Sequence, residues 1–371
     1  MDDDRTTPSA AALLHLRGRG LTPGEPLPPP LTLAAMFHAP GAGTGHAVYG
    51  RTDNPTWEAL EHALGHLEGA EAVAFPSGMA AISAALFATL KAGDRLLIPS
   101  DGYYVTRLLA GQVLDRFGVA VDQRPTATFA EGGFAGYRVV YVETPSNPGL
   151  DLCDIAAVAA AAKAEGALVI ADNTTMTPFG QRPLDLGADI VVAADTKAPG
   201  GHSDVLMGHA ASRDPALVAA LRDWRRISGA IPGPFEAWLT HRSLETLELR
   251  FARMCDTAGA AAARLAAVAG IAVRYPGLPG DPGHNLARAQ MARMGFLIGL
   301  TLPSEAAAEA FTAACPYLRP ATSFGGVHSS AERRARWGDA VAPGYVRLSV
   351  GCEPADELIP ALEAALAAAL A

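Results

Sequence analysis

The sequence predicts an α/β protein with a mostly parallel central sheet and a smaller α+β domain at the C-terminal end. Between about residues 71 and 212, short apolar runs without polar alternation are separated by helical segments, which is typical of parallel strands buried on both faces. After about residue 240 a long helical segment, two apolar runs and a final alanine-rich helix follow. Because 371 residues exceed one compact core, we expect two domains.

The first element is an N-terminal arm over residues 1–48. It contains "LTPGEPLPPPLTL" and "APGAGTGH", and their Pro and Gly content favours an extended segment, which often lies across a neighbouring subunit. "GAGTGH" does not indicate a dinucleotide site, since no strand precedes it and the third glycine is missing. The large domain is expected over residues 49–240 and the smaller C-terminal domain over 241–371.

A helix is predicted directly after the arm. Asn54 is placed as its N-cap, Pro55 as its first residue and Gly69 as its end. "AVAFPSGMAAISAALFATLKAGD" then predicts a strand, a tight turn at Ser77–Gly78 and a helix from about Met79. The remaining strands of the large sheet are predicted in "RLLIPS", "VAVDQ", "RVVYVETPSNP", "ALVIADNT", "ADIVVAADTK" and "VLMGHAAS".

Composition excludes several classes of function. The formal charge of −9 comes without a basic cluster, which argues against nucleic acid as a partner. The four cysteines have no CxxC spacing, so reduced thiols are expected rather than disulfides or a metal site. The N-terminus has no signal-peptide pattern, and no apolar run of about 18 residues would cross a membrane, so we expect a cytoplasmic protein.

Polar side chains follow the predicted strands at the points where they end. Tyr103 follows "RLLIPS", Glu143 and Asn147 follow "RVVYV", Asp172 closes "ALVIA", and Lys197 follows "DIVVAAD". Because sites in parallel sheets gather at the carboxyl ends of the strands, these five side chains are expected to converge.

A lysine with a lowered pKa can form a Schiff base with a carbonyl, and pyridoxal phosphate is the cofactor most often held in this way. Its ring nitrogen needs an acidic partner, for which Asp172 is the candidate, and Tyr103 could stack on the ring. The phosphate needs donors, and the helix that opens at Ser77, Gly78 and Met79 offers backbone N–H groups and the helix dipole.

Several segments together resemble one family. They are "YGRTDNPTWEALE", "FPSGMAAI", "DGYY", "VETPSNP", "ADNTTMTPFGQRPLDLGADIVV", "TKAPGGHSDVLMG", "GPFEAWLTHRSLETLELR", "SFGG" and "YVRLSVGCE". In order and spacing, from about residue 47 to 355, they resemble the Cys/Met-metabolism enzymes that use pyridoxal phosphate, which include the cystathionine lyases and synthases and methionine gamma-lyase. The resemblance implies the aspartate aminotransferase-like fold (fold type I) and a homotetramer built as a dimer of dimers.

The resemblance also implies a role for individual residues. Lys197 would hold the cofactor and move protons, Asp172 would pair with the pyridine nitrogen, and Tyr103 would act near the leaving group. The phosphate would be held by Gly78, Met79 and Thr196, with Tyr49 and Arg51 reaching in from the neighbouring subunit. Arg347 would bind the substrate α-carboxylate with Ser323 and Asn147. These roles suit the side chains, because the planar fork of arginine matches phosphate and carboxylate.

The chain departs from the family pattern at three places. A serine is common three residues before the lysine, but here Ala194 stands there and Asp195 follows, so one phosphate contact is expected to be missing. A carboxylate at Asp195 would repel a phosphate unless it points away or pairs with Arg51. Tyr104 and Val105 make a bulkier wall after Tyr103, and Thr322 replaces a glutamate that often meets the distal amino group of cystathionine.

The expected function is γ-elimination on a sulfur amino acid such as L-cystathionine, giving 2-oxobutyrate, ammonia and a thiol, closest to cystathionine gamma-lyase. Alternatives within the fold are γ-replacement on an O-acylhomoserine and methionine gamma-lyase activity. A catalytically silent relative kept for binding is a third possibility. A nicotinamide oxidoreductase would need a glycine fingerprint between a first strand and helix, and the sequence has none.

Overall fold

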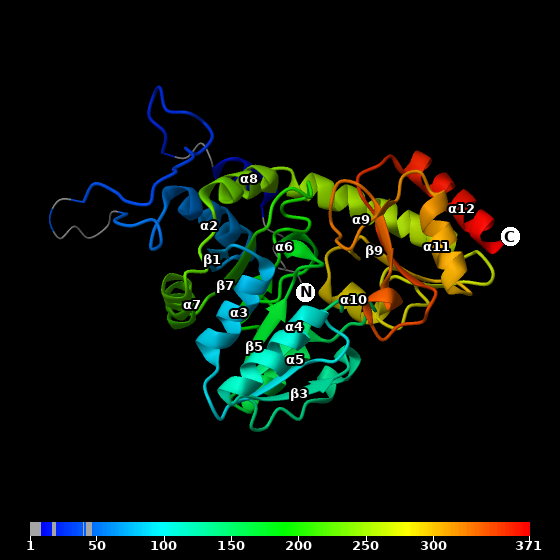
Figure 1. Cartoon of the computed structure of the whole chain (residues 1–371), viewed down its shortest axis with the longest axis horizontal. Coiled ribbons are helices and arrows are strands. Elements are labelled where there is room, and N and C mark those ends of the chain that lie inside the picture. Colours follow the sequence, from blue (N-terminus) through cyan, green and yellow to red (C-terminus); the bar gives the residue numbers. More distant parts are fainter. Residues whose placement is uncertain (1–8, 17–19, 40, 42–46) are drawn as a thin grey trace, which may run out of the picture.

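The computed structural model describes residues 9–16, 20–39, 41 and 47–371. These residues form two sheets with helices packed around each, and Figure 1 shows the second sheet and its helices at the C-terminal end of the molecule. The predicted α/β class with a mostly parallel central sheet is confirmed. The domain boundaries at residues 48 and 240 stay a prediction. Most of "GAGTGH" and of the N-terminal "MDDDRTTPSA" lies outside the described residues.

The large sheet has seven strands in the order β1-β7-β6-β5-β4-β2-β3. The strands from β6 to β3 run parallel to one another, while β7 is antiparallel to both β1 and β6. The run "VLMGHAAS", predicted as a strand, therefore contains the antiparallel strand β7. The strands are β1 (Glu71–Phe75), β2 (Arg95–Pro99), β3 (Ala120–Arg124), β4 (Val139–Glu143), β5 (Leu168–Asp172), β6 (Ile190–Ala193) and β7 (Gly208–Ser212).

Helices cover both faces of this sheet, as the apolar runs predict. On one face, side chains such as Phe75, Ile170 and Val192 pack with α3 (Gly78–Thr89) and α7 (Pro215–Ser228). On the other face, Val191 packs in a cluster with α2 (Pro55–Glu68) and α8 (Pro234–Leu244), and α5 (Ile155–Ala164) covers the β4–β5 part. Shorter elements are α1 (Ala10–Leu14), α4 (Tyr104–Leu109), η2 (Ala110–Leu114), η3 (Asp115–Phe117), η4 (Thr126–Glu131) and α6 (Thr177–Gly180).

Helix α2 has the predicted ends. The Asn54 side chain accepts a hydrogen bond from the Thr56 N–H, and Pro55 needs no partner for its nitrogen at the first helical position. Gly69 ends the helix with φ 63°, a left-handed conformation that favours glycine. The arm ahead of α2 is mostly without regular structure, but it contains the short helix α1 and a bridge between Met36 and Tyr49.

The C-terminal part is built on a five-stranded sheet of order β10-β11-β12-β9-β8. Its strands are β8 (Ala272–Arg274), β9 (Leu297–Thr301), β10 (Arg319–Pro320), β11 (Ser330–Arg333) and β12 (Tyr345–Ser349). Residues of α9 (Leu247–Leu265), α11 (Glu305–Ala314) and α12 (Ala355–Leu370) form one apolar cluster with β9 and β12. The remaining elements are α10 (His284–Gln290) and η5 (Arg334–Trp337).

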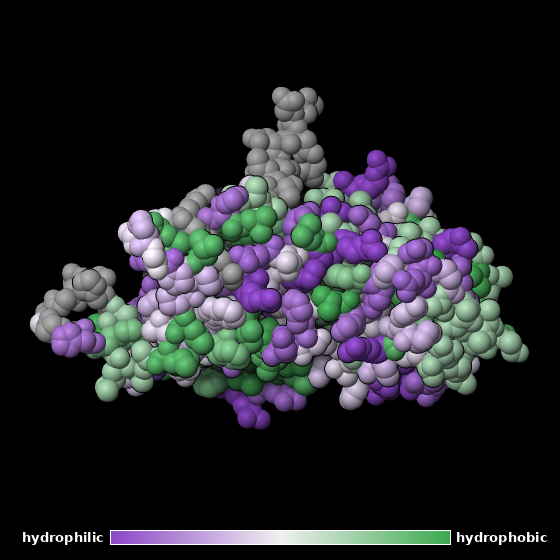
Figure 2. All heavy atoms as spheres, turned by 90° about the horizontal axis from the view of Figure 1, so that it is seen from above, coloured by the Kyte–Doolittle hydropathy of each residue, from purple (hydrophilic) through white to green (hydrophobic). Residues whose placement is uncertain are grey.

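The surface alternates between polar and apolar areas, and Figure 2 shows separate apolar patches on one face. Several large apolar side chains stay exposed, among them Leu33, Met36, Leu206 and Phe235. Contiguous exposed apolar area is a common mark of an interaction surface. Within the described ranges, no helix is both long enough and apolar enough to span a bilayer.

Candidate active site

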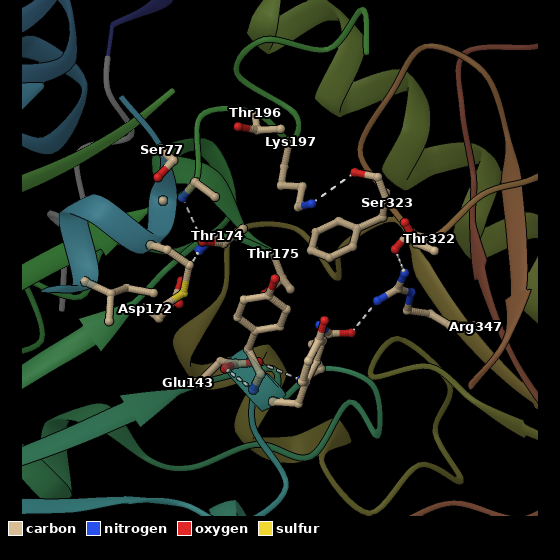
Figure 3. A pocket seen from close by; sticks show the side chains of 18 of the residues that line it. Ser77, Glu143, Asp172, Thr174, Thr175, Thr196, Lys197, Thr322, Ser323 and Arg347 are labelled. Carbon is tan, nitrogen blue, oxygen red and sulfur yellow. Dashed lines mark hydrogen bonds between the residues drawn. The ribbon is translucent and has the colours of Figure 1, made fainter. Parts of the chain in front are cut away.

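A cavity of about 340 Å³ lies where the predicted side chains converge (Figure 3). One wall comes from the carboxyl ends of β4, β5 and β6 and from the first turn of α3, all in the large sheet region. The facing wall comes from the loop at residues 322–324, from η5 and from β12. The two sheets therefore share one site. Except for Tyr49 and Arg51, all of the predicted site residues line this cavity.

The end of the cavity at α3 is suited to an anion. Ser77 caps the helix by accepting a hydrogen bond from the Ala80 N–H at 3.1 Å. The amides of Gly78 and Met79 belong to the first turn, where N–H groups have no partner within the helix. A side chain at Gly208 would collide with the Ser77–Gly78 backbone, so β7 supports this turn by close backbone packing.

Lys197 lies on the turn after β6, and its amine donates to the Ser323 hydroxyl at 2.9 Å. The same amine lies 4.9 Å from the centre of the Phe324 ring. Burial and then the positive charges of Arg347 and Arg334 lower the pKa of Lys197 to about 8. A neutral amine is therefore accessible near physiological pH, as a nucleophile or proton-transferring base requires.

Asp172 closes β5 as predicted and is buried beneath the cavity. One of its oxygens accepts from the Tyr141 hydroxyl at 2.8 Å and the other from the Thr174 N–H at 3.0 Å. Burial raises the pKa of Asp172, and the hydrogen bonds from Thr174 and Tyr141 oppose that rise. Such a fixed carboxylate is what a buried ring nitrogen requires as a partner.

Tyr103 is the residue before α4, and its backbone N–H donates to Glu143 at 2.7 Å. The other carboxylate oxygen of Glu143 accepts from the Asn147 N–H, also at 2.7 Å. Glu143 therefore ties together the two segments that carry Tyr103 and Asn147. Burial and then the charge of Asp172 raise the pKa of Glu143 to about 8. Burial also raises the pKa of Tyr103, so its hydroxyl keeps its proton at neutral pH.

Arg347 projects into the cavity from β12, on the side of Thr322 and Ser323 (Figure 3). Its guanidinium donates to the Asn147 side chain and, at 2.8 Å, to the Thr322 carbonyl. Its Nε is buried and has no hydrogen-bond partner within the described structure. Burial, and next the charge of Arg334, lower the pKa of Arg347 to about 10, so it remains a cation. A buried guanidinium with an unused donor is suited to binding a carboxylate.

The carboxylate of Asp195 points away from the cavity. It is fully buried and accepts from His209 Nδ1 at 2.9 and 3.0 Å. The repulsion expected at this position is therefore avoided, although the partner is His209 and not Arg51. Ala194 does line the cavity, and its backbone N–H donates to the Thr174 hydroxyl at 2.9 Å.

Tyr49 and Arg51 lie elsewhere on this chain. Both are exposed, the Arg51 guanidinium stacks 5.4 Å from the Tyr49 ring centre, and Arg51 donates to the Arg226 carbonyl. Neither residue lines the cavity of its own chain. Their predicted role in the site of a neighbouring subunit stays a prediction.

A cluster of side chains at the mouth of the cavity was not predicted from the sequence. Arg334 and Trp337 line the cavity from η5, and Trp337 is 55% exposed. Buried Glu332 holds both of them, accepting from Arg334 at 2.6 Å and from the Trp337 indole. The sequence does contain a signal for this cluster, because the segment "AERRARWGD" has three arginines close to one glutamate.

The residues present fit pyridoxal phosphate. The open first turn of α3 with Thr196 suits its phosphate, Lys197 its aldehyde carbon and Asp172 its ring nitrogen. The aromatic side chain of Tyr103 lines the same cavity and offers a face for the ring. The donor set at each position thus agrees with the chemistry of the group that it would hold.

The similarity to known proteins covers nearly the whole chain. The family model described as "Cys/Met metabolism PLP-dependent enzyme" matches residues 29–367. A Streptomyces coelicolor protein named "Putative cystathionine gamma-lyase" is 51% identical over 350 residues, covering 92% of this chain and 89% of that protein. The cystathionine gamma-synthase of Mycobacterium tuberculosis is 39% identical over 353 residues, covering 91% of each.

A solved structure has the same architecture. The cystathionine gamma-synthase of Xanthomonas oryzae pv. oryzae, in complex with aminoacrylate and cysteine, has a TM-score of 0.93 and 35% identity. The match covers 97% of this chain and 98% of that one. The names of these relatives divide between lyase and synthase, so the reaction has to be argued from the site.

Proposed function

The chain belongs to the family of Cys/Met-metabolism enzymes that depend on pyridoxal phosphate, and from this premise we propose that it carries out γ-elimination on a sulfur amino acid such as L-cystathionine. The products would be 2-oxobutyrate, ammonia and a thiol, here cysteine. The observation that carries the proposal is the position of the Lys197 amine, which shares one cavity with the protonated Tyr103 hydroxyl and the Arg347 guanidinium. A base, an acid and a carboxylate anchor are the groups that this reaction needs.

Pyridoxal phosphate, when bound, supplies an electron sink for bonds broken at the substrate Cα. We propose that its phosphate is held by the amides of Gly78 and Met79 together with Ser77 and Thr196. Asp172 would keep the ring nitrogen protonated, and the bond from Tyr141 holds the Asp172 carboxylate in place for this.

The substrate is oriented by its α-carboxylate. Arg347 would bind this group with the donor that it leaves unused, while Asn147 and the Thr322 carbonyl fix the position of the guanidinium. The Ser323 hydroxyl lies in the same cavity, where it accepts a hydrogen bond from the Lys197 amine. This arrangement directs the substrate Cα towards the lysine.

Two protons have to move before sulfur leaves. The Lys197 amine, with a pKa near 8, would take the Cα proton, release it to the C4' carbon of the cofactor and, neutral again, remove a proton from Cβ. The Tyr103 hydroxyl, whose pKa is raised by burial, would donate its proton to the departing thiolate. Both groups line the same cavity, so one bound substrate can lie within reach of the base and the acid.

A second candidate function is γ-replacement on an O-acylhomoserine, in which a thiol adds after the γ-substituent has left. The name of the Mycobacterium tuberculosis relative favours it. Methionine gamma-lyase activity is a third candidate, because Thr322 offers no carboxylate for the distal ammonium of cystathionine and methionine has no such group. These alternatives differ in the group at the γ-position and in whether a thiol is consumed.

The tests compare products. The purified holoenzyme is given L-cystathionine alone, L-methionine alone, or O-succinylhomoserine with cysteine. Release of 2-oxobutyrate and cysteine from cystathionine supports the proposed function. Formation of cystathionine from the third mixture, without release from cystathionine alone, would replace it with the synthase.

We further propose that the chain works as a homotetramer, a dimer of dimers, in which Tyr49 and Arg51 complete the site of the neighbouring subunit. The support is their exposure outside the cavity of their own chain and the exposed apolar residues of the same arm. Mixing inactive Arg51→Ala and Lys197→Ala chains tests it, because a hybrid contains one intact site. Recovered activity supports a shared site, and a mixture as inactive as its parents contradicts it.

We propose a cytoplasmic location. The four cysteines are free and three of them are buried, which suits a reducing compartment.

A further inference from the structure

Three charged side chains meet in the core beside the turn that carries Lys197. Glu68 is the last residue of α2, His209 lies on β7, and Asp195 lies two residues before Lys197. Their side chains are at most 2% exposed. His209 Nδ1 lies 2.9 Å from Asp195, and Nε2 lies 3.2 Å from Glu68. This charged bridge joins three segments that are far apart in the sequence.

Both ring nitrogens of His209 face a carboxylate. A neutral imidazole has one nitrogen that can only accept, and that nitrogen would oppose the lone pairs of a carboxylate. With both carboxyl groups ionised, the geometry therefore requires a proton on each nitrogen. Burial by itself would lower the pKa of His209, but the carboxylates of Asp195 and Glu68 outweigh it and raise the pKa to about 10. Across the described residues, no group of His, Cys, Asp and Glu is arranged to hold a metal ion.

The bridge holds the lysine turn from the side opposite the cavity. Asp195 is followed by Thr196, which exchanges hydrogen bonds with Met207: the Thr196 N–H donates to the Met207 carbonyl at 3.1 Å, and the Met207 N–H donates to the Thr196 hydroxyl at 3.0 Å. Asp195 is thus joined to β7 itself and Thr196 to the residue just before it. Gly208 lies between these two anchors and packs on the backbone of the α3 turn.

The other side of the same turn is held differently. The Arg250 guanidinium donates to the carbonyls of Ala198 and Pro199, and Gly200 N donates to the Asp195 carbonyl. After Lys197, the turn is held by hydrogen bonds to its backbone carbonyls. Before Lys197, it is held by the charged bridge through Asp195. Burying two carboxylates and an imidazolium is costly when they are incompletely paired, and it is not needed for packing alone.

We propose that Glu68, His209 and Asp195 form a carboxylate–imidazolium–carboxylate bridge that positions the Thr196–Lys197 turn for cofactor binding. All three are positioning residues, since Asp195 points away from the cavity and Glu68 acts only through His209. The inference requires the cofactor but does not depend on which sulfur amino acid is the substrate.

A matched pair of variants on α2 tests the role in cofactor binding. Glu68→Ala breaks the bridge at the end farthest from Lys197. Glu61→Ala, two turns earlier on the same helix, removes a carboxylate that pairs with Arg225 and accepts from the Ala74 N–H, away from the lysine turn. Equilibrium dialysis of the full chain against pyridoxal 5'-phosphate gives the dissociation constant, and urea unfolding of the same samples gives the stability.

Both variants are expected to lower the urea midpoint, but only Glu68→Ala should weaken cofactor binding, by about tenfold. An unchanged dissociation constant in Glu68→Ala, or an equal loss in both variants, would overturn the positioning role. Asp195→Asn keeps the shape of the side chain and serves if Glu68→Ala fails to fold. It should likewise weaken cofactor binding, and normal affinity would count against the bridge.

The charge state of His209 is measured on the unaltered chain. ¹⁵N spectra of the histidine rings at pH 7.5, assigned by comparison with His209→Asn, should show His209 with both nitrogens protonated. A neutral ring at His209 would contradict the imidazolium and with it the bridge.

Discussion

The two halves of the site are built in different ways. The cofactor half comes from the ends of β4, β5 and β6 and the first turn of α3, where the backbone itself determines which side chains meet. The substrate half comes from a loop, the 3-10 helix η5 and one strand of the second sheet, where buried charges hold one another in place. In the sheet, strand register determines which functional groups meet, whereas the position of groups in the irregular wall depends on contacts among its own charged side chains.

This difference explains what the sequence could predict. Asp172 and Lys197 follow apolar runs of neighbouring parallel strands, and in the structure Asp172 pairs in register with Val192 of β6. Their meeting follows from the rule for strand ends. The α3 turn was predictable for the same reason, because its serine, glycine and position after a strand are local signals.

The substrate half could be predicted only in part. The resemblance indicated Arg347, but its bond to Asn147 joins residues 200 positions apart. Glu332, Arg334 and Trp337 were missed, because pairing among them depends on how η5 folds and not on a periodic pattern. His209 was missed for a related reason: within a strand, "GHAAS" gives no sign of two carboxylates that arrive from α2 and the lysine turn.

Replacing Lys197 should have the largest effect on activity, and this effect should arise in the cofactor half of the site. Lys197→Ala removes the proton-transferring amine, so kcat should fall by about 10⁴-fold or more. The chain has two other lysines, and Lys91→Arg and Lys163→Arg are matched controls that should keep full activity. Steady-state release of 2-oxobutyrate measures the effect. Substantial activity in Lys197→Ala would remove the basis of the assigned chemistry.

Replacing Arg347 should have the largest effect on activity within the substrate half of the site. Arg347→Ala would leave the α-carboxylate without its buried partner, so kcat/KM should fall by about 10³-fold, mainly through KM. Arg347→Lys restores the charge without the planar fork and should recover part of this loss. Dialysis should show pyridoxal phosphate still bound in both variants. If the cofactor is lost as well, the two halves are not separable in this way.

The halves should nevertheless be coupled through charge. Only a neutral amine can attack an aldehyde, and the Lys197 pKa of about 8 means that capture of pyridoxal phosphate by the cofactor-free chain should accelerate as pH rises. The rate should increase by about tenfold per unit between pH 6 and 7.5 and level off above 8, in proportion to the neutral fraction. Stopped-flow absorbance at several pH values measures it.

Arg347 and Arg334 contribute to that pKa after burial, since their charges disfavour a second cation. In Arg347→Ala the repulsion is reduced, the Lys197 pKa should rise, and the midpoint of the capture rate should shift to higher pH. Arg264→Ala, which removes an exposed arginine paired with Glu363, should leave the midpoint in place. A midpoint that does not differ between Arg347→Ala and the unaltered chain would show that the halves are electrostatically independent.

The smallest of these effects should come from Glu332, which touches neither substrate nor cofactor in this scheme. Its carboxylate accepts from Arg334 and Trp337 and lies 3.6 Å from Arg347, so Glu332→Gln should loosen the whole wall. We expect KM to rise by about tenfold with kcat changed less than threefold. Glu309→Gln, which alters a pair with Arg333 on the opposite face of β11, should change neither. A fall confined to kcat would instead mean that the wall acts on the chemical step, and that the substrate half does more than hold the substrate.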